Sequence, residues 1–416
     1  MKKFLSIALL LMMSSTASAM SLQQAAEIAV ANNPSLQRTR HEIDAARQDV
    51  KIARGQKGVS VSINGSFDAN KSEGVQESES ASSRLSGSLP IYSGRRLESA
   101  IQSAELGVDI AQFNFEQSTD DLIFEVTTAY VNALENRATK AVDIETHDNL
   151  VEHERNIEEL YRAGSKAKID WLRATVEVSN STQDVARSHA AYEVSLTQLA
   201  TLLSLDAITD IDVEDFFVDI EMIDDLEYYL RSAEENRNDI KADVLKIEQG
   251  EVQITSAKSG WLPEINASAG AGFSARSRNW DPTSDASAGL NASWNIFDSN
   301  VTRARVDEAR IALEQLKLAM QSDIESVREE VITAHKNLRS ALIRLTTTQK
   351  AVELAEEERY IATERYRAGE GILLDVLDSE LALSTAKKNH VSAKYDVIRY
   401  HFQLKHAMGS TLNRQG

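Results

Sequence analysis

The chain repeats itself at an offset of about 205 residues, and this duplication limits its possible folds more than any other feature of the sequence. The segment Tyr161–Gly164, which reads Tyr-Arg-Ala-Gly, returns as Tyr366–Gly369. Further matches at the same offset are Asp170 with Asp375, Leu172 with Leu377, Pro90–Ser93 with Asn295–Asp298, Thr128–Ala129 with Thr333–Ala334, Asn33 with Asn238, and Gly55 with Gly260. Because so many matches at one offset are hard to obtain by chance, we expect one structural unit written twice.

Each half has the same predicted order: a helix, two short strands around a polar loop, a very long helix, a glycine turn and a last helix. We expect helices over residues 22–54, 95–162 and 167–203 in the first half, and over 224–258, 301–367 and 373–408 in the second. A helix of about 67 residues is about 100 Å long. Because the two shorter helices of each half add up to nearly that length, a tall helical wall is predicted rather than a globule. A free-standing rod would explain the helices but not the strands.

The second long helix carries a coiled-coil pattern. Apolar residues follow 3–4 spacing from Ile324 onward, with interruptions at Thr348 and Arg359. The positions are Val327, Val331, Ala334, Leu338, Ala341, Leu345, Val352 and Ala355. A 3.5-residue period predicts left-handed supercoiling against neighbouring helices.

Four segments alternate apolar residues with small polar ones. They are residues 59–68, 85–91, 265–274 and 288–296. Such runs of about ten residues are typical of outer-membrane barrel strands, with lipid on one face and water on the other. An ordinary hairpin on a soluble sheet is the alternative. We expect hydrophilic loops over 71–83 and 275–285, and an aromatic girdle near the strand ends from Trp261, Trp280 and Trp294.

Four strands cannot close a barrel. Bacterial barrels have at least about eight strands, and open edges are not tolerated in lipid. The chain must therefore oligomerise if these strands span a membrane. Two copies would give eight strands and three would give twelve.

The first residues predict export. Lys2 and Lys3 precede the short apolar run 4–13, and Ala17–Ala19 is a small-residue cleavage site, as in a secretory signal peptide. A short anchor helix is the alternative. The sequence has no cysteine, which excludes disulfides, thiolate metal sites and a lipidated cysteine. No later segment is apolar enough for a membrane-spanning helix, so the mature chain should be periplasmic, secreted or a β-barrel.

The formal net charge of −19 argues against nucleic acid or anionic lipid as a partner. Acidic residues concentrate between the two halves, around the pair Phe216-Phe217. We expect a solvated linker whose phenylalanines pack on the helices, with a partner-binding surface as the alternative. The predicted divisions are a signal peptide 1–19, repeat 1 over 20–203, an acidic linker 204–223, repeat 2 over 224–409 and a tail 410–416.

No catalytic pattern stands out. HExxH, GxSxG and Walker motifs are absent from the sequence. We therefore predict that the chain is not an enzyme, that it has no metal or cofactor site, and that any ATP is used by a partner.

The two Tyr-Arg-Ala-Gly turns, each with an aspartate six residues after its glycine, make a family resemblance specific. Together with Leu89–Gly94 and the run Arg365–Gly369 followed by Asp375–Asp378, they resemble the TolC family of outer membrane efflux proteins over essentially the whole mature chain. The resemblance implies a mixed α+β membrane protein. Its homotrimer would share a twelve-stranded outer-membrane β-barrel, continued by an α-helical barrel in the periplasm, with the linker in an equatorial band.

The resemblance also implies partners and cargo. Family members act with a periplasmic adaptor and an inner-membrane ABC or RND pump, in multidrug efflux, metal efflux or type I protein secretion. We favour type I secretion on overall likeness and on the lack of a lipidated cysteine. A non-pore coiled-coil surface protein is the competing hypothesis, and an adaptor would need a β-domain that is not apparent.

The turns are the candidate gate. Gly164 and Gly369 stand where a left-handed helix cap is expected. Asp375 and Asp378 share a helix face, so a trimer would stack them as acidic rings that favour cations. By resemblance, Asp375 and Asp378 are the aperture aspartates, Asp170 is the acidic position of the first repeat, Tyr366 belongs to the closing network, and Tyr161, Arg162 and Arg367 lie beside them. Gly371 replaces the gating arginine of the best-known member. Helix capping by Asp170 and Asp375 is the alternative.

Overall fold

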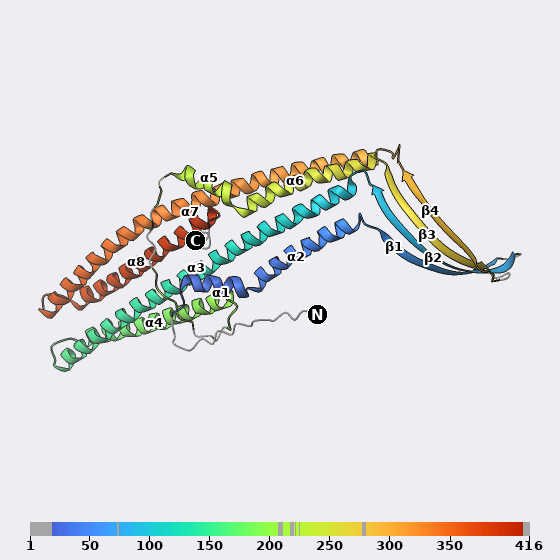
Figure 1. The fold of residues 1–416 in the computed structure, drawn as a ribbon. Helices are drawn as coiled ribbons and strands as arrows, with labels where there is room; N and C mark the ends of the chain where they lie inside the picture. The colour runs from blue at the N-terminus through green and yellow to red at the C-terminus, as the bar shows by residue number, and fades with distance from the viewer. Residues whose placement is uncertain are drawn as a thin grey trace. The chain divides into compact units, whose positions relative to one another are not determined.

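The computed structural model describes residues 19–72, 75–206, 211–216, 220, 222–223, 225–276 and 280–410. The predicted signal peptide, apart from Ala19, lies outside these residues, as do Phe217 and most of the C-terminal tail. The elements are α1 Leu22–Asn32, α2 Pro34–Gly55, β1 Ser60–Ser72, β2 Val75–Tyr92, α3 Arg96–Arg162, α4 Lys168–Leu202, α5 Leu226–Asn236, α6 Asn238–Lys258, the 3₁₀ turn η1 Ser259–Trp261, β3 Glu264–Arg276, β4 Thr283–Ser293, α7 Val301–Arg367 and α8 Leu373–Ala407 (Figure 1).

The first predicted helix of each half is in fact two helices. In the first half the chain turns extended at Asn33, because Pro34 disfavours a helical residue before it and begins α2. In the second half the break falls at Arg237, which is extended and precedes α6. The prediction of continuous helices was therefore wrong at these two points, whereas the ends of α3, α4, α7 and α8 lie within one residue of the prediction.

The four strands form one antiparallel sheet in chain order, with β1 and β4 at its edges (Figure 1). The predicted loop over 71–83 was wrong for most of its length, because β2 already begins at Val75 and pairs with β1 up to the turn. The second hairpin loop is likewise shorter than predicted, since β3 ends at Arg276 and β4 begins at Thr283.

The two faces of the sheet have opposite character. The pairing places Ile63, Leu85, Ala271 and Ala286 in one row across all four strands, and the next row is wholly polar or glycine. The apolar side chains are largely exposed, as Ile63 at 73% shows. Among the residues that the structure describes, no layer of the chain covers this face.

The chain divides into two compact units, and each holds segments of both predicted repeats. Unit 1 comprises residues 1–34, 119–235 and 328–416, and unit 2 comprises 35–118 and 236–327, including all four strands. The predicted heptad residues Val327, Val331, Ala334, Leu338 and Ala341 are buried, so the coiled-coil face of α7 is a packed face.

The acidic linker belongs to unit 1 and contacts other segments of that unit through both backbone and side chains. Met20 and Val213 form an isolated parallel bridge, and the Tyr130 hydroxyl lies 2.7 Å from the carbonyls of both Met20 and Glu214. Phe216 packs its ring against Tyr130 and Phe402. The described half of the phenylalanine pair thus packs on the helices, as expected for a linker.

The matched glycines Gly55 and Gly260 should respond differently to alanine. A Cβ atom on Gly260 would lie 2.6 Å from Oγ1 of Thr302, whereas a Cβ on Gly55 would meet nothing within 4 Å. We expect Gly260→Ala to destabilise unit 2 by about 1–3 kcal/mol through overpacking. Gly55→Ala is the control and should be neutral or stabilising by about 0.5 kcal/mol. Thermal melting followed by circular dichroism measures both, and equal melting points would contradict the prediction.

Candidate functional site

The two predicted tip turns have one geometry. Gly164 and Gly369 have φ angles of 74° and 78°, the left-handed conformation that glycine adopts without strain. The amide of the residue after each glycine donates to the carbonyl of Leu160 or Arg365, five residues back, at 2.9 Å. Each long helix therefore ends in a Schellman cap, and the expected left-handed cap is confirmed.

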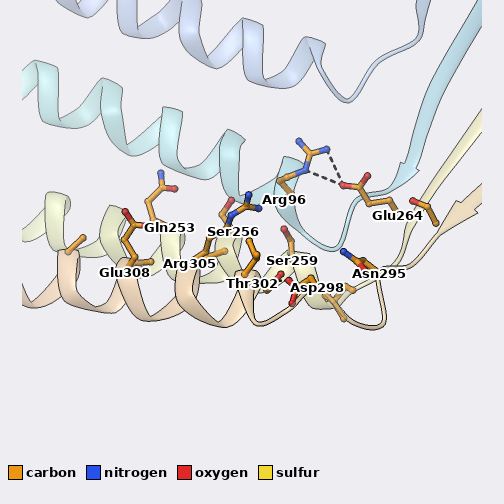
Figure 2. A pocket seen from close by; sticks show the side chains of 17 residues that line it. Arg96, Gln253, Ser256, Ser259, Glu264, Asn295, Asp298, Thr302, Arg305 and Glu308 are labelled. Atoms are coloured by element: carbon orange, nitrogen blue, oxygen red, sulfur yellow. Dashed lines mark hydrogen bonds and ion pairs between the residues drawn. The ribbon is translucent and has the colours of Figure 1, made fainter.

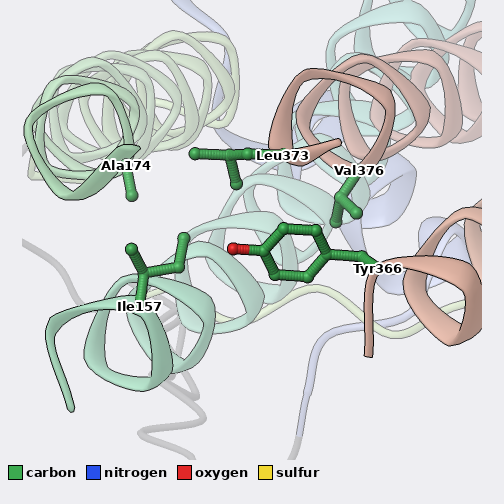
Figure 3. Close-up of a cluster of buried hydrophobic side chains, with 5 residues drawn as sticks. All are labelled: Ile157, Ala174, Tyr366, Leu373 and Val376. Carbon is green, nitrogen blue, oxygen red and sulfur yellow. The ribbon is translucent and has the colours of Figure 1, made fainter. Parts of the chain in front are cut away.

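A buried cluster joins the two helix pairs near these turns. It contains Ile157 of α3, Ala174 of α4, Tyr366 of α7, and Leu373 and Val376 of α8. Figure 3 shows the Tyr366 ring pointing from α7 toward Ile157, with the two α8 side chains on one side of it. The ends of α3–α4 and α7–α8 are thus packed on one another within unit 1, and we name this set the tip cluster.

Tyr366 contributes its ring more than its hydroxyl. The side chain is 7% exposed, and among the described residues its hydroxyl has no hydrogen-bond partner. Burial and the nearby Asp170 carboxylate raise the pKa of Tyr366. The ammonium group of Lys166 lies over the ring, 4.1 Å from its centroid. This cation–π contact ties the first turn to the second.

His153 is a tip residue that sequence reasoning missed. Its ring centroid lies 5.7 Å from that of Tyr366, and its buried Nε2 has no partner in the described part of the chain. Burial, together with the positive charge of Arg367, lowers the pKa of His153, and Glu152 opposes this shift. The imidazole is therefore held neutral inside the packing.

Trp171 and Glu154 were missed as well. Trp171 stacks on Tyr161 with centroids 5.7 Å apart, and its Nε1 donates to the Glu154 carboxylate at 2.7 Å. Thr175 donates to the same carboxylate. These contacts hold α3 against α4. In the sequence, only the tryptophan directly after Asp170 could have indicated them.

Asp375 and Asp378 lie together, as their spacing predicts. Both side chains are exposed and line a groove of about 540 Å³ between α7 and α8, shared with Arg365, Glu357 and Glu358. The capping alternative is wrong, since Ala167 and Ile372 occupy the N-cap positions. Asp170 and Asp375 are instead first-turn acids, which the helix dipole favours.

The neighbouring arginines do not pair with these carboxylates. Arg162 binds Glu158 at 2.7 Å and Arg367 binds Glu364 at 2.9 Å, each within its own helix. Gly371 stands where a Cβ would come within 3.1 Å of the Tyr366 amide nitrogen. A side chain at this position would crowd the end of α7, which gives a local reason for glycine in place of the expected arginine.

A second concave site, of about 890 Å³, lies in unit 2 beside the starts of β3 and α7. Figure 2 shows Arg96 bound to Glu264, and Asp298 near Thr302 at the first turn of α7. The Asp298 carboxylate accepts from the Thr302 amide at 2.7 Å. Arg96 and Glu264 thus neutralise each other here, and Asp298 caps the first turn of α7.

Within the described residues there is no group of three or more metal-ligating side chains. Over the same part of the chain, no helix has the length and apolarity needed to cross a membrane.

Comparison with known proteins identifies the class. The family described as outer membrane efflux protein matches residues 25–204 and 229–410, and the chain belongs to this family. The family membership confirms the resemblance, places the chain among outer-membrane efflux channels and agrees with the prediction that it is not an enzyme.

Individual relatives agree. The chain is 25% identical to outer membrane protein TolC of Escherichia coli K12 over its whole length and 88% of that protein. It is 22% identical to protein CyaE of Bordetella pertussis, covering 89% of this chain and 80% of CyaE. The solved outer-membrane channel OprN superposes with a TM-score of 0.81 at 21% identity, over 94% of this chain and 90% of OprN. The structural likeness shows the shared fold.

Proposed function

We propose that three copies of the chain form one exit duct through the outer membrane. Each copy would give its four strands to a twelve-stranded barrel, with the helices extending into the periplasm. The observation that carries the proposal is the open sheet. Within the described residues its two edge strands pair with no further strand, which leaves them open to strands of other copies, and its exposed apolar face suits lipid. Membership in an efflux family argues against the non-pore coiled-coil alternative.

The two repeats would be equivalent walls of the duct. The family match falls on two segments separated by residues 205–228, which supports repeats at 20–203 and 224–409 around an acidic linker. The packing of Phe216 and the bridge to Met20 support a structural role for the linker in an equatorial band.

The helix ends would be the periplasmic gate. Asp375 and Asp378 are the proposed aperture residues, with Asp170 as their weaker counterpart in the first repeat. Tyr366 would keep the ends closed through the tip cluster, and Tyr161 through its stack on Trp171. Gly164 and Gly369 form the turns that a periplasmic adaptor would engage, flanked by Arg162 and Arg367.

For cargo we favour polypeptides passed on by an inner-membrane ABC exporter, as in type I secretion. Drug or metal efflux with an RND pump is the second candidate. The polar face of the sheet supports the first choice, because it is rich in hydroxyl groups and balanced in charge, and so suits a cargo that carries both signs.

Purified full-length protein tests the duct directly. The mass in detergent should be that of a trimer, and the protein should insert into planar bilayers and conduct ions. A soluble elongated monomer that never inserts would refute the proposal.

The aperture aspartates should set cation preference. We expect the double variant Asp375→Asn, Asp378→Asn to lower the potassium-to-chloride permeability ratio roughly fivefold, the factor that corresponds to about 1 kcal/mol of lost cation attraction, which is the order of one close charge contact in water. Asp44→Asn on α2 is the control and should leave the ratio unchanged. Reversal potentials in a salt gradient measure it, and an unchanged ratio in the double variant would reject the acidic rings.

A further inference from the structure

The polar face of the sheet is a surface of hydroxyl groups, amides and glycines. Serine pairs cross from β1 to β2, with Ser60 and Ser88 joined by a 2.7 Å hydrogen bond. The pairs Ser62–Ser86 and Ser66–Ser82 repeat this at 3.0 and 2.9 Å. Within each pair the two hydroxyl groups share a hydrogen bond, and the pairs carry no charge.

One row interrupts this neutral surface. The register aligns Asn64, Arg84, Gly272 and Asp285 across the four strands. The guanidinium of Arg84 crosses β3 and binds the Asp285 carboxylate, with Nη2 and Oδ2 2.5 Å apart. The two residues are 201 positions apart and belong to different repeats. The ion pair therefore links β2 to β4 over the strand between them.

Glycines on β3 make room for the crossing. A Cβ on Gly272 would lie 3.4 Å from Cβ of Arg84, and one on Gly270 would lie 3.5 Å from its Nη1. Larger side chains at these positions would lift the guanidinium off the sheet. The arginine thus lies along the surface instead of projecting from it.

The remaining charges on this face also balance. Asp68 and Arg276 share one row, on either side of Ser80. At the opposite end of β3, Glu264 is bound by Arg96. Among the described side chains of this face, each acid thus has a base in its row or bound to it, although the whole chain has a net charge of −19.

We infer that the opposite charges of Arg84 and Asp285 cancel each other. The outer part of the duct therefore does not select solutes by their charge. The inference rests on the proposed function, in which this face lines the water-filled interior. In a trimer, the three Arg84–Asp285 pairs at one level would form a neutral ring lying flat on the inner wall of the barrel. Charge selection is then left to the helix ends, and a chain with charges of both signs passes the barrel without binding to it.

Single-charge variants test the pair in planar bilayers. Asp285→Asn leaves Arg84 uncompensated and should lower the potassium-to-chloride permeability ratio about twofold, a modest change because both side chains are about half exposed. Arg84→Gln should raise the ratio by a similar factor. The double variant is the matched control and should restore the wild-type ratio.

Because the sequence has no cysteine, a single introduced cysteine can be modified selectively. This allows a second measurement in which the charge is changed on one folded variant. Asp285→Cys should lower the ratio, an anionic methanethiosulfonate reagent should restore it, and a cationic reagent should lower it further. If the wild type conducts but neither single variants nor reagents move the ratio, the inference fails while the duct stands. If the wild type does not conduct, the duct itself fails.

Discussion

Replacing Tyr366 with alanine should separate the packed helix ends of unit 1, whereas replacing it with phenylalanine should leave them closed. The ring is nearly fully buried among Ile157, Leu373 and Val376. Removing a buried aromatic ring costs about 3–5 kcal/mol, so alanine should raise local opening more than a hundredfold. Hydrogen exchange of the amides near Gly369 measures the opening, and the conductance of the alanine variant should rise with it.

The phenylalanine variant separates ring from hydroxyl. The Tyr366 hydroxyl is buried without a hydrogen-bond partner in the described chain, so its removal should be neutral or slightly stabilising. Phenylalanine also keeps an aromatic face for Lys166. Exchange as fast in the phenylalanine variant as in the alanine variant would show that the hydroxyl, rather than the ring, closes the tip.

Most of the fold was predictable because its elements are long and regular. The bounds of α7 match the prediction at both ends, because no proline or glycine interrupts residues 301–367 and Gly369 then ends the helix. The errors have physical causes. The sequence of residues 75–83 is mostly glutamine, glutamate and serine, so the apolar alternation vanishes although the backbone still pairs. No proline in the sequence marks the helix break at Arg237.

The candidate site was predictable only where local geometry defines it. A glycine after a helical run indicates a left-handed cap, and i,i+3 spacing places Asp375 beside Asp378. The contact of His153 with Tyr366 joins residues more than 200 positions apart, and periodicity says nothing about such pairs. The Arg84–Asp285 pair needs the register of three strands, which alternation alone leaves free.

Mild acid should loosen the tip cluster through His153. Because burial and Arg367 lower its pKa, the folded tip holds the imidazole neutral, while an exposed histidine takes up a proton below about pH 6.5. The stabilisation from the neutral ring is therefore complete above that pH and is lost progressively as the pH falls below it. Protonation would place a second cation beside Arg367, with the smaller compensation of Glu152, and Lys166 already lies against the facing Tyr366 ring.

His153→Phe keeps a ring of similar size and cannot be protonated. The ratio of tip exchange rates, wild type over variant, cancels the intrinsic pH dependence of exchange. This ratio should stay level above about pH 7 and rise as the pH falls toward about 5.5. His41→Gln is the matched control, because the His41 side chain is 79% exposed, and its ratio should stay flat. His401, whose pKa burial lowers to about 4, titrates elsewhere on α8, so the amides beside Gly369 are the ones to follow. A His153→Phe ratio that does not change with pH would show that the tip opens, if at all, without this histidine.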